Sequence, residues 1–251
     1  MARVAIITGA AQGIGEAIAH KLLSNNIDVA LVDLPQKMTA LEQVVKTIEG
    51  DGRKAIAIGC DVSKEKEVQE MVKKTVDTFG NLDIMVANAG VMGYSPILEL
   101  SDELLDRFIT INLKGVLYCY RAAAVQMIKQ GRGGRIIGAS SILGIQGAMN
   151  SAGYCASKFG VRALTQTGAL EWGQHNITVN AYAPGYIDTP MVAETGGGSH
   201  GENFLPLLRN SSLKRMGRPE EIVAVVEFLA SEGASYVTGQ TFGANGGYIL
   251  S

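Results

Sequence analysis

Tyr154 and Lys158 are the residues of this sequence whose types and spacing could do acid–base chemistry. They stand four positions apart in a stretch whose pattern predicts a helix, so both side chains are expected on one helix face. A neighbouring ammonium favours the phenolate form of tyrosine, whereas burial opposes it. The pair therefore predicts a proton donor or acceptor that works near neutral pH, with help from a second cation such as an oxidised nicotinamide ring.

A glycine-rich turn near the start of the chain predicts a dinucleotide site. An apolar run at 4–7 leads into TGAAQGIG at 8–15, a helical pattern through Leu23 and a second apolar run that ends in Asp33. Glycines allow a tight turn and a close approach to a pyrophosphate at the positive end of the helix. A carboxylate after the second strand binds the adenosine ribose and repels a 2′-phosphate. Because 9–15 holds no lysine or arginine, Asp33 favours NAD over NADP.

Strand and helix patterns alternate along the rest of the chain. Further strands are expected at 54–59, 82–86, 133–138 and 177–180, the last one followed by a turn at Pro184-Gly185. Helical patterns cover Met38 to Glu49, Glu65 to Phe79, a long region from Ser101 through Lys129 that contains Asn112, and the segment with Tyr154 and Lys158. This alternation predicts a single α/β domain over 1–251, a Rossmann-type, doubly wound parallel sheet of about seven strands with helices on both faces.

Small and polar residues follow several predicted strands, where open α/β sheets bind their ligands. Asp61 can contact an adenine or cap the following helix, and the sequence leaves both roles open. Asn88, Ala89 and Gly90 would let an adenosine lie against the end of the next strand. Ser141 follows the strand after that.

Composition excludes several classes of protein. The 22 Lys and Arg against 24 Asp and Glu give a net charge of −2 without a long basic block, so neither nucleic acid nor an anionic membrane is an expected partner. No apolar run approaches the roughly 18 residues of a membrane span. The amino terminus has no signal-peptide pattern, which predicts a cytoplasmic protein. The 3 cysteines have no CxxC or Cys/His spacing, so neither a disulfide framework nor a metal site is expected.

Together these motifs resemble the short-chain dehydrogenase/reductase family over essentially the full chain. The matching pieces are TGAAQGIG at 8–15, CDV at 60–62, NAG at 88–90, Asn112, Ser141, YCASK at 154–158, PG at 184–185 followed by Thr189, and GRPEEI at 217–222. The resemblance implies that Tyr154 is the acid/base and that Ser141 binds the substrate oxygen. It also implies that Lys158 holds the nicotinamide ribose and lowers the tyrosine pKa, and that Asn112 positions a water for the proton relay.

The same resemblance implies the remaining contacts and the assembly. Ile187 and Thr189 match positions that touch the nicotinamide carboxamide, and a homotetramer is expected, with a dimer as the alternative. The expected cofactor contacts are Gly9, Gln12, Gly13, Ile14, Gly15, Asp33, Asp61, Val62, Asn88, Ala89, Gly90, Tyr154, Lys158, Pro184, Gly185, Ile187 and Thr189. The chain departs from the family at Ala87 and Gly138, where asparagine is common, and at Asn245, where aspartate is common.

These residues predict hydride transfer between a carbinol carbon and NAD, with Tyr154 moving the proton on the oxygen. Specificity is expected from 92–96, 142–151 and a substrate loop at about 186–215, in which Gly196 to Gly198 suit a mobile lid. The predicted substrate contacts are Ser141, Tyr154, Met92, Ile142, Tyr186 and Met191, with Leu143 as a further wall. Such an apolar pocket favours small or medium ketones over charged acids.

Within the family, the segments at 159–167 and 177–185 look most like diacetyl/acetoin reductases, which are 2,3-butanediol dehydrogenases. The alternatives are a sugar or polyol dehydrogenase, and a 3-oxoacyl-thioester reductase, against which Asp33 counts because such enzymes commonly use NADPH. A binding protein that keeps the NAD site without chemistry is the non-enzyme alternative. A Ser-His-Asp hydrolase is discounted, because His20, His175 and His200 form no recognisable triad pattern with Ser141.

Overall fold

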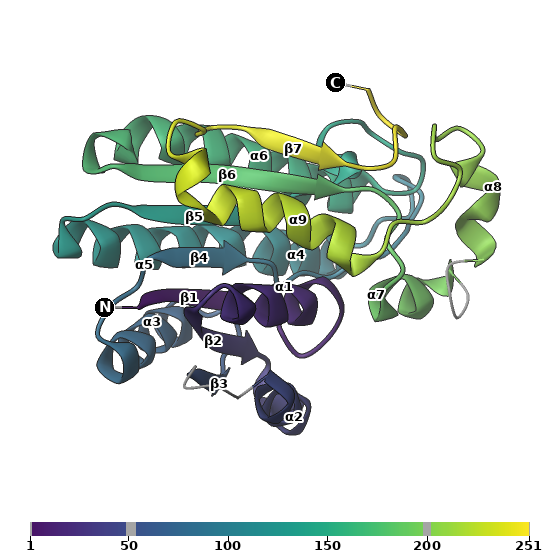
Figure 1. Cartoon of the computed structure of the whole chain (residues 1–251). Coiled ribbons are helices and arrows are strands. Elements are labelled where there is room, and N and C mark those ends of the chain that lie inside the picture. The colour runs from purple at the N-terminus through teal and green to yellow at the C-terminus, as the bar shows by residue number, and fades with distance from the viewer. Residues whose placement is uncertain (1, 49–53, 198–201, 251) are drawn as a thin grey trace.

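A sheet of seven parallel strands, in the order β3-β2-β1-β4-β5-β6-β7, forms the middle layer of the protein (Figure 1). The computed structural model describes residues 2–48, 54–197 and 202–250. The strand order reverses between β1 and β4, which is the switch point of a doubly wound sheet. The strands are β1 (Arg3–Thr8), β2 (Ile27–Asp33), β3 (Ala55–Gly59), β4 (Ile84–Ala87), β5 (Gly134–Ala139), β6 (Ile177–Pro184) and β7 (Thr241–Ala244).

Helices cover both faces of this sheet, as the alternating sequence pattern predicts. They are α1 (Gly13–Ser24), α2 (Met38–Ile48), α3 (Glu65–Phe79), α4 (Asp102–Phe108), α5 (Gly115–Gln130), α6 (Ala152–Trp172), α7 (Pro190–Val192), α8 (Leu205–Leu208) and α9 (Pro219–Ala230). Successive strand residues point to opposite sides. On β1, Ala5 and Ile7 therefore pack in the core that contains α1, α2 and α9, while Ile6 packs in the core with α3, α5 and α6. The single Rossmann-type domain is confirmed.

Local sequence signals explain where several helices begin and end. The side chain of Ser101 accepts a hydrogen bond from the Leu104 N–H and caps α4, as expected for a serine in that place. Helix α3 buries Val68, Val72 and their neighbours on one face and ends at Gly80, whose φ of +91° is the left-handed conformation that favours glycine.

Two elements differ from the sequence prediction. The long helical region is interrupted by a π-helical turn at Ile109–Lys114, which separates α4 from α5 and contains Asn112. Strand β6 continues to Pro184 instead of ending at Asn180, because it is paired along its length with β5 and β7. Residues Ala193–Gly197 form a further π-helical turn, while Gly198 of the predicted lid lies outside the described residues.

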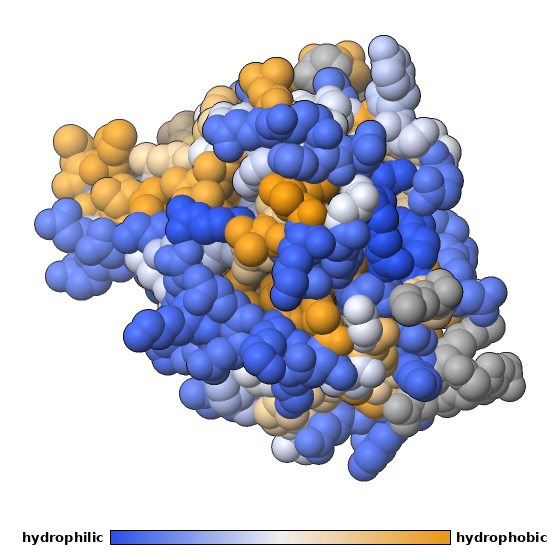
Figure 2. Space-filling view, turned by 90° about the vertical axis from the view of Figure 1, so that its left-hand side faces the viewer, coloured by the Kyte–Doolittle hydropathy of each residue, from blue (hydrophilic) through white to orange (hydrophobic). Residues whose placement is uncertain are grey.

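The two ends of the sheet differ in character. Figure 2 shows the end at which the strands begin, where mainly hydrophilic residues surround a smaller number of hydrophobic ones. The cavities described below lie at the other end. No helix in the described part of the chain is long and apolar enough to cross a membrane. Cys60, Cys119 and Cys155 are buried free thiols, and within residues 2–48, 54–197 and 202–250 no group of His, Cys, Asp and Glu is placed to hold a metal.

Candidate active site

The turn between β1 and α1 forms the floor of a groove at the carboxyl ends of the strands. Gly9 and Gly13 have φ angles of +67° and +63°, which favour glycine. A Cβ on Gly15 would lie 2.1 Å from the carbonyl oxygen of Gly9. The groove, of 220 Å³, is lined by these residues predicted from the sequence: Gly9, Gln12, Gly13, Ile14, Gly15, Asp33, Asp61, Val62, Asn88, Ala89, Gly90 and Thr189.

Asp33 lies at the end of β2 and lines this groove. Its Oδ2 accepts a hydrogen bond from the Ala11 N–H at 3.1 Å, and its Oδ1 accepts one from the Leu34 N–H at 2.8 Å. These bonds hold the carboxylate beside the glycine turn. Lys37 also lines the groove, although it lies outside the glycine turn, whose lack of cations favours NAD in the sequence.

Asp61 stabilises the turn that precedes α3. Its Oδ1 accepts hydrogen bonds from the N–H and the Oγ of Ser63, at 3.0 and 2.7 Å. The N-cap position of α3 belongs to Lys64, so Asp61 is not the cap of that helix. Asp61 also lines the groove, and its contact with an adenine stays a prediction.

Asn88 joins three strands beneath the groove. Its Nδ2 donates to the carbonyl oxygens of Thr8 and Gly9, at 2.8 and 3.2 Å. Its Oδ1 accepts a hydrogen bond of 2.7 Å from the hydroxyl of Tyr182, a fully buried residue of β6. The sequence reasoning missed Tyr182, whose only signal is a hydroxyl-bearing ring within a buried strand. These hydrogen bonds hold the glycine turn in place. They form even though the preceding residue is Ala87, where the family often has an asparagine.

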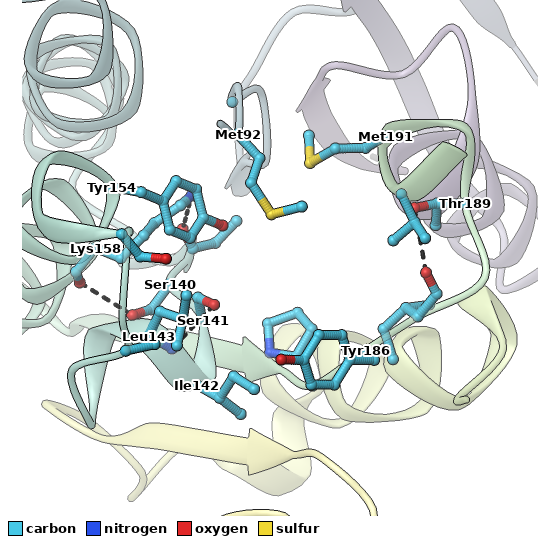
Figure 3. Close-up of a pocket in the computed structure, with 18 of the residues that line it drawn as sticks. Met92, Ser140, Ser141, Ile142, Leu143, Tyr154, Lys158, Tyr186, Thr189 and Met191 are labelled. Carbon is cyan, nitrogen blue, oxygen red and sulfur yellow. Dashed lines mark hydrogen bonds between the residues drawn. The ribbon is translucent and has the colours of Figure 1, made fainter. Parts of the chain in front are cut away.

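A larger cavity of 440 Å³ lies beside the groove and extends over the ends of β5 and β6. Six residues line both spaces, so the two form one continuous cleft; they are Ile14, Asn88, Gly90, Val91, Thr189 and Met191. Figure 3 shows Tyr154 and Ser141 at one side of this cavity, with Met92 and Met191 across it from Tyr186. The other predicted residues that line it are Lys158, Pro184, Gly185, Ile187, Ile142 and Leu143.

Tyr154 and Lys158 come together on α6 and are almost fully buried, with 7% and 4% of their surfaces exposed. The Lys158 Nζ donates a hydrogen bond of 2.8 Å to the Ala139 carbonyl oxygen and lies 5.7 Å from the centre of the Tyr154 ring. Ser141 lies two residues after the end of β5, and its Oγ accepts a hydrogen bond from the Leu143 N–H at 3.1 Å. Phe108 of α4 packs edge-on against the Tyr154 ring at 6.1 Å.

The protein's own groups raise the pKa of Tyr154, while the sequence expectation is that Lys158 lowers it. Burial raises the pKa of this phenol to about 12, although its hydrogen bond with Ser141 acts in the opposite direction. Burial also lowers the pKa of Lys158 to about 8. Burial disfavours the charged form of both groups, and the Lys158 hydrogen bond is made to Ala139; the lowering of the tyrosine pKa by Lys158 stays a prediction.

Asn112 lies behind the cleft and lines neither space. It is fully buried in the π-helical turn. Its Oδ1 accepts from the Val91 N–H at 2.8 Å, and its Nδ2 donates to the Val91 carbonyl oxygen at 2.9 Å and to the Ser157 Oγ at 3.2 Å. The side chain thus holds Val91, which lines both parts of the cleft, while its role toward a water stays a prediction.

Several side chains that line the larger cavity were not singled out from the sequence, although all of them but Tyr248 lie in the segments expected to set specificity. They stand in segments without regular period, where the sequence does not indicate which side chains point inward. The only available signal is their position after the carboxyl ends of strands or in the expected substrate loop. These residues are Tyr94, Met149, Val192, Phe204, Leu207 and Tyr248.

Comparison with known proteins places this architecture in a family. A family model described as enoyl-(acyl carrier protein) reductase matches residues 9–249. A short-chain dehydrogenase/reductase from Armillaria gallica is 46% identical over 99% of this chain and 96% of that protein. An L-2,3-butanediol dehydrogenase from Corynebacterium glutamicum is 37% identical over 100% of both chains. A 3-oxoacyl-[acyl-carrier-protein] reductase from Synechocystis is 38% identical over 99% of this chain and 98% of that one.

Solved structures agree with these relatives. A short-chain type dehydrogenase/reductase from Mycobacterium marinum has a TM-score of 0.92 and 35% identity, covering 99% of this chain and 96% of the other. An acetoin dehydrogenase from Salmonella typhimurium has a TM-score of 0.89 and 33% identity, covering 100% and 97%. The fold and the cleft define the class of Rossmann-type oxidoreductases. More narrowly, the chain belongs to the short-chain dehydrogenase/reductase family.

Proposed function

We propose that this protein is an NAD(H)-dependent oxidoreductase that interconverts a small or medium secondary alcohol and its ketone. One observation carries the proposal: Tyr154 and Ser141 line an apolar cavity that is continuous with the glycine-turn groove. A proton donor, a second hydroxyl for the substrate oxygen and a nucleotide groove are thereby within one cleft. That combination suits hydride transfer to or from the carbon that bears the substrate oxygen.

The residues of the groove fit a dinucleotide. The turn at Gly9, Gly13 and Gly15 has no room for a Cβ at its closest approach, and its N–H groups would hold the pyrophosphate. Asp33 would bind the adenosine ribose, which supports NAD over NADP. Lys158 would hold the nicotinamide ribose. When bound, the nicotinamide supplies or accepts the hydride.

Side chains of the larger cavity would supply the proton and bind the substrate oxygen. With its pKa raised to about 12, the Tyr154 phenol is protonated at neutral pH and can donate its proton to a ketone oxygen. Ser141 would donate a hydrogen bond to the same oxygen and polarise the carbonyl. Lys158, with its pKa lowered to about 8, still carries its charge at neutral pH. These protonation states suit reduction.

The substrate class follows from the relatives and from the lining. The similarity to a butanediol dehydrogenase and to an acetoin dehydrogenase supports diacetyl, acetoin and 2,3-butanediol as candidates. Lys158 is the one charged side chain among the described residues of the cavity lining. That scarcity of charged groups counts against the anionic carriers of 3-oxoacyl thioesters.

We also infer that copies of the chain assemble as a homotetramer in the cytoplasm. On α6, Leu170 is 86% exposed and Phe159 is 41% exposed. Large apolar side chains of this kind support association between copies. The buried free thiols are compatible with a reducing compartment.

The test is oxidation of NADH in the presence of diacetyl, acetoin and a panel of other ketones, followed by absorbance. Tyr154→Phe is expected to keep NADH affinity and to lose about 10²–10⁴-fold in kcat, because it removes the donated proton. Tyr118→Phe, on α5 and outside the cleft, is the matched control and should keep full activity. NADH binding without turnover of any ketone would instead favour the non-catalytic alternative.

A further inference from the structure

We propose that the cavity selects ketones that carry an aromatic ring next to the reacting carbonyl, an inference that rests on the proposed function and narrows its substrate class. Four rings that line the cavity follow one another in space. The ring centres are 6.4 Å apart for Tyr94 and Phe204, 5.2 Å for Phe204 and Tyr186, and 5.5 Å for Tyr186 and Tyr248. We call these four residues the aromatic wall.

The aromatic wall is assembled from segments far apart in the sequence. Tyr94 follows β4, Tyr186 follows β6, Phe204 precedes α8, and Tyr248 follows β7. Tyr186, Phe204 and Tyr248 are half-buried, Tyr94 is 40% exposed, and burial raises the pKa of the Tyr186 phenol. A partly buried surface of this kind offers ring faces and edges to a ligand, and aromatic partners pack at centre separations of about 4.5–7 Å.

Two methionines that line the cavity are also suited to a flat apolar group, and one of them, Met92, adjoins the Tyr94 end of the aromatic wall, because the Tyr94 hydroxyl donates to its sulfur at 3.8 Å. Met92 and Met191 lie across the cavity from Tyr186 (Figure 3). Thioether sulfurs make favourable contacts with aromatic rings, and the unbranched methionine side chain adjusts to the shape of its ligand. A ring placed between these methionines and Tyr186 would contact apolar atoms on both sides.

The size of the cavity supports a substrate larger than diacetyl. Its 440 Å³ lies within the range of about 300–1,000 Å³ found for pockets that enclose drug-sized ligands. Part of this volume belongs to the nicotinamide end, because Ile187 and Thr189 line it. The aromatic wall borders the remainder. A diacetyl-sized molecule would leave much of that wall uncovered, whereas a phenyl substituent would cover it.

The test compares three vicinal diketones with NADH: diacetyl, the diketone in which one methyl is replaced by phenyl, and a linear alkyl diketone with the same number of carbons as the phenyl compound. The phenyl compound is expected to exceed both others in kcat/KM by about tenfold or more, the scale on which apolar pockets discriminate. Equal or lower values for the phenyl compound overturn the inference while leaving the proposed function intact. Turnover of no ketone would overturn both.

Variants locate the selectivity. Phe204→Ala should reduce the phenyl-to-diacetyl ratio of kcat/KM by about tenfold. This ratio is independent of how much of each preparation is folded. The control is Phe228→Ala, which removes an exposed ring of α9 that packs against Phe242 and does not line the cavity. An unchanged ratio in Phe204→Ala, or an equal fall in both variants, would contradict the role of the aromatic wall.

Discussion

The groove and the larger cavity are adjacent parts of one cleft, yet they are built in different ways. The groove is shaped by backbone: positive φ angles at Gly9 and Gly13, and carbonyl oxygens held by Asn88. The cavity is shaped by side chains that enter from irregular segments, as the aromatic wall does. Changes in the groove should therefore weaken the reaction of every substrate alike, while changes in the cavity should alter the order of substrates.

Gly15→Ala should give the largest effect on the groove. The new methyl would meet the Gly9 carbonyl oxygen at 2.1 Å, so the turn must shift. We expect a loss of about 3 kcal/mol in the free energy of unfolding and a severe loss of NADH affinity, with all ketones affected equally. Urea unfolding and NADH fluorescence titration measure the two quantities.

Gly173→Ala is the matched control for this variant. Gly173 has a right-handed helical conformation, and a Cβ there would meet nothing within 4 Å. Alanine should therefore leave the free energy of unfolding unchanged or raise it by up to about 1 kcal/mol. Normal NADH affinity in Gly15→Ala would show that the groove is less rigid than its backbone geometry indicates.

Lys158 lines the larger cavity next to Gly90, which lines both spaces, and its burial should make stability depend on pH. Its pKa falls from 10.5 to about 8 in the folded protein. Below a pH of about 8, Lys158 is protonated in both the folded and the unfolded protein, and the full cost of burying its ammonium group lowers the stability of the fold. Between the two values the unfolded chain binds more protons, so stability rises with pH. From about pH 7 to about pH 9.5 the wild type should gain about 2 kcal/mol relative to Lys158→Met.

Urea unfolding of both proteins without cofactor, at the two pH values, measures this difference. Groups common to both proteins cancel in the comparison. An equal change of unfolding free energy with pH in the two proteins would mean that Lys158 keeps its ordinary pKa in the folded state. Lys158→Met should also lose turnover of every ketone, because Lys158 is expected to hold the nicotinamide ribose.

Asp33→Ala should give the smallest of these effects, a shift in cofactor preference without a change in substrate order. Removing the carboxylate relieves repulsion of a 2′-phosphate, so the NAD-to-NADP ratio of kcat/KM should fall about tenfold. Asp28→Ala is the control, because Asp28 lies on the same strand and holds the Lys54 N–H outside the groove. An unchanged ratio in Asp33→Ala would place cofactor selection elsewhere, with Lys37 as the next residue to test.

The sequence predicts the groove better than the cavity for a physical reason. A turn that needs glycine at Gly9 and Gly15 can be recognised from the local sequence, and so can a strand end that carries Asp33. The spacing of Tyr154 and Lys158 likewise places both on one helix face. The sequence could not show that burial, more than the ammonium, determines the tyrosine pKa, because that depends on how completely other segments cover the ring.

The irregular segments explain what remained unpredicted. Phe204 and Tyr248 reach the cavity through turns whose conformation depends on their neighbours, so no periodicity marks them. Tyr182 is hidden within a strand pattern that any large residue would satisfy. Asn112 was expected in a continuous helix, whereas the structure has a π-helical turn there, which differs from an α-helix by about one residue per turn.

The π-helical turn at Ile109–Lys114 determines how the faces of α4 and α5 are rotated relative to each other. One extra residue per turn offsets the faces of α4 and α5 by about 100° relative to an uninterrupted helix. With this offset, Phe108 meets Tyr154 while Asn112 holds Val91 and α5 still buries its own apolar side in the core. The number of residues in Ile109–Lys114 should therefore matter more for the positions of α4 and α5 than the type of residue at most places in this turn. Deleting one residue there would leave α4 and α5 helical but would rotate one of them relative to the cleft.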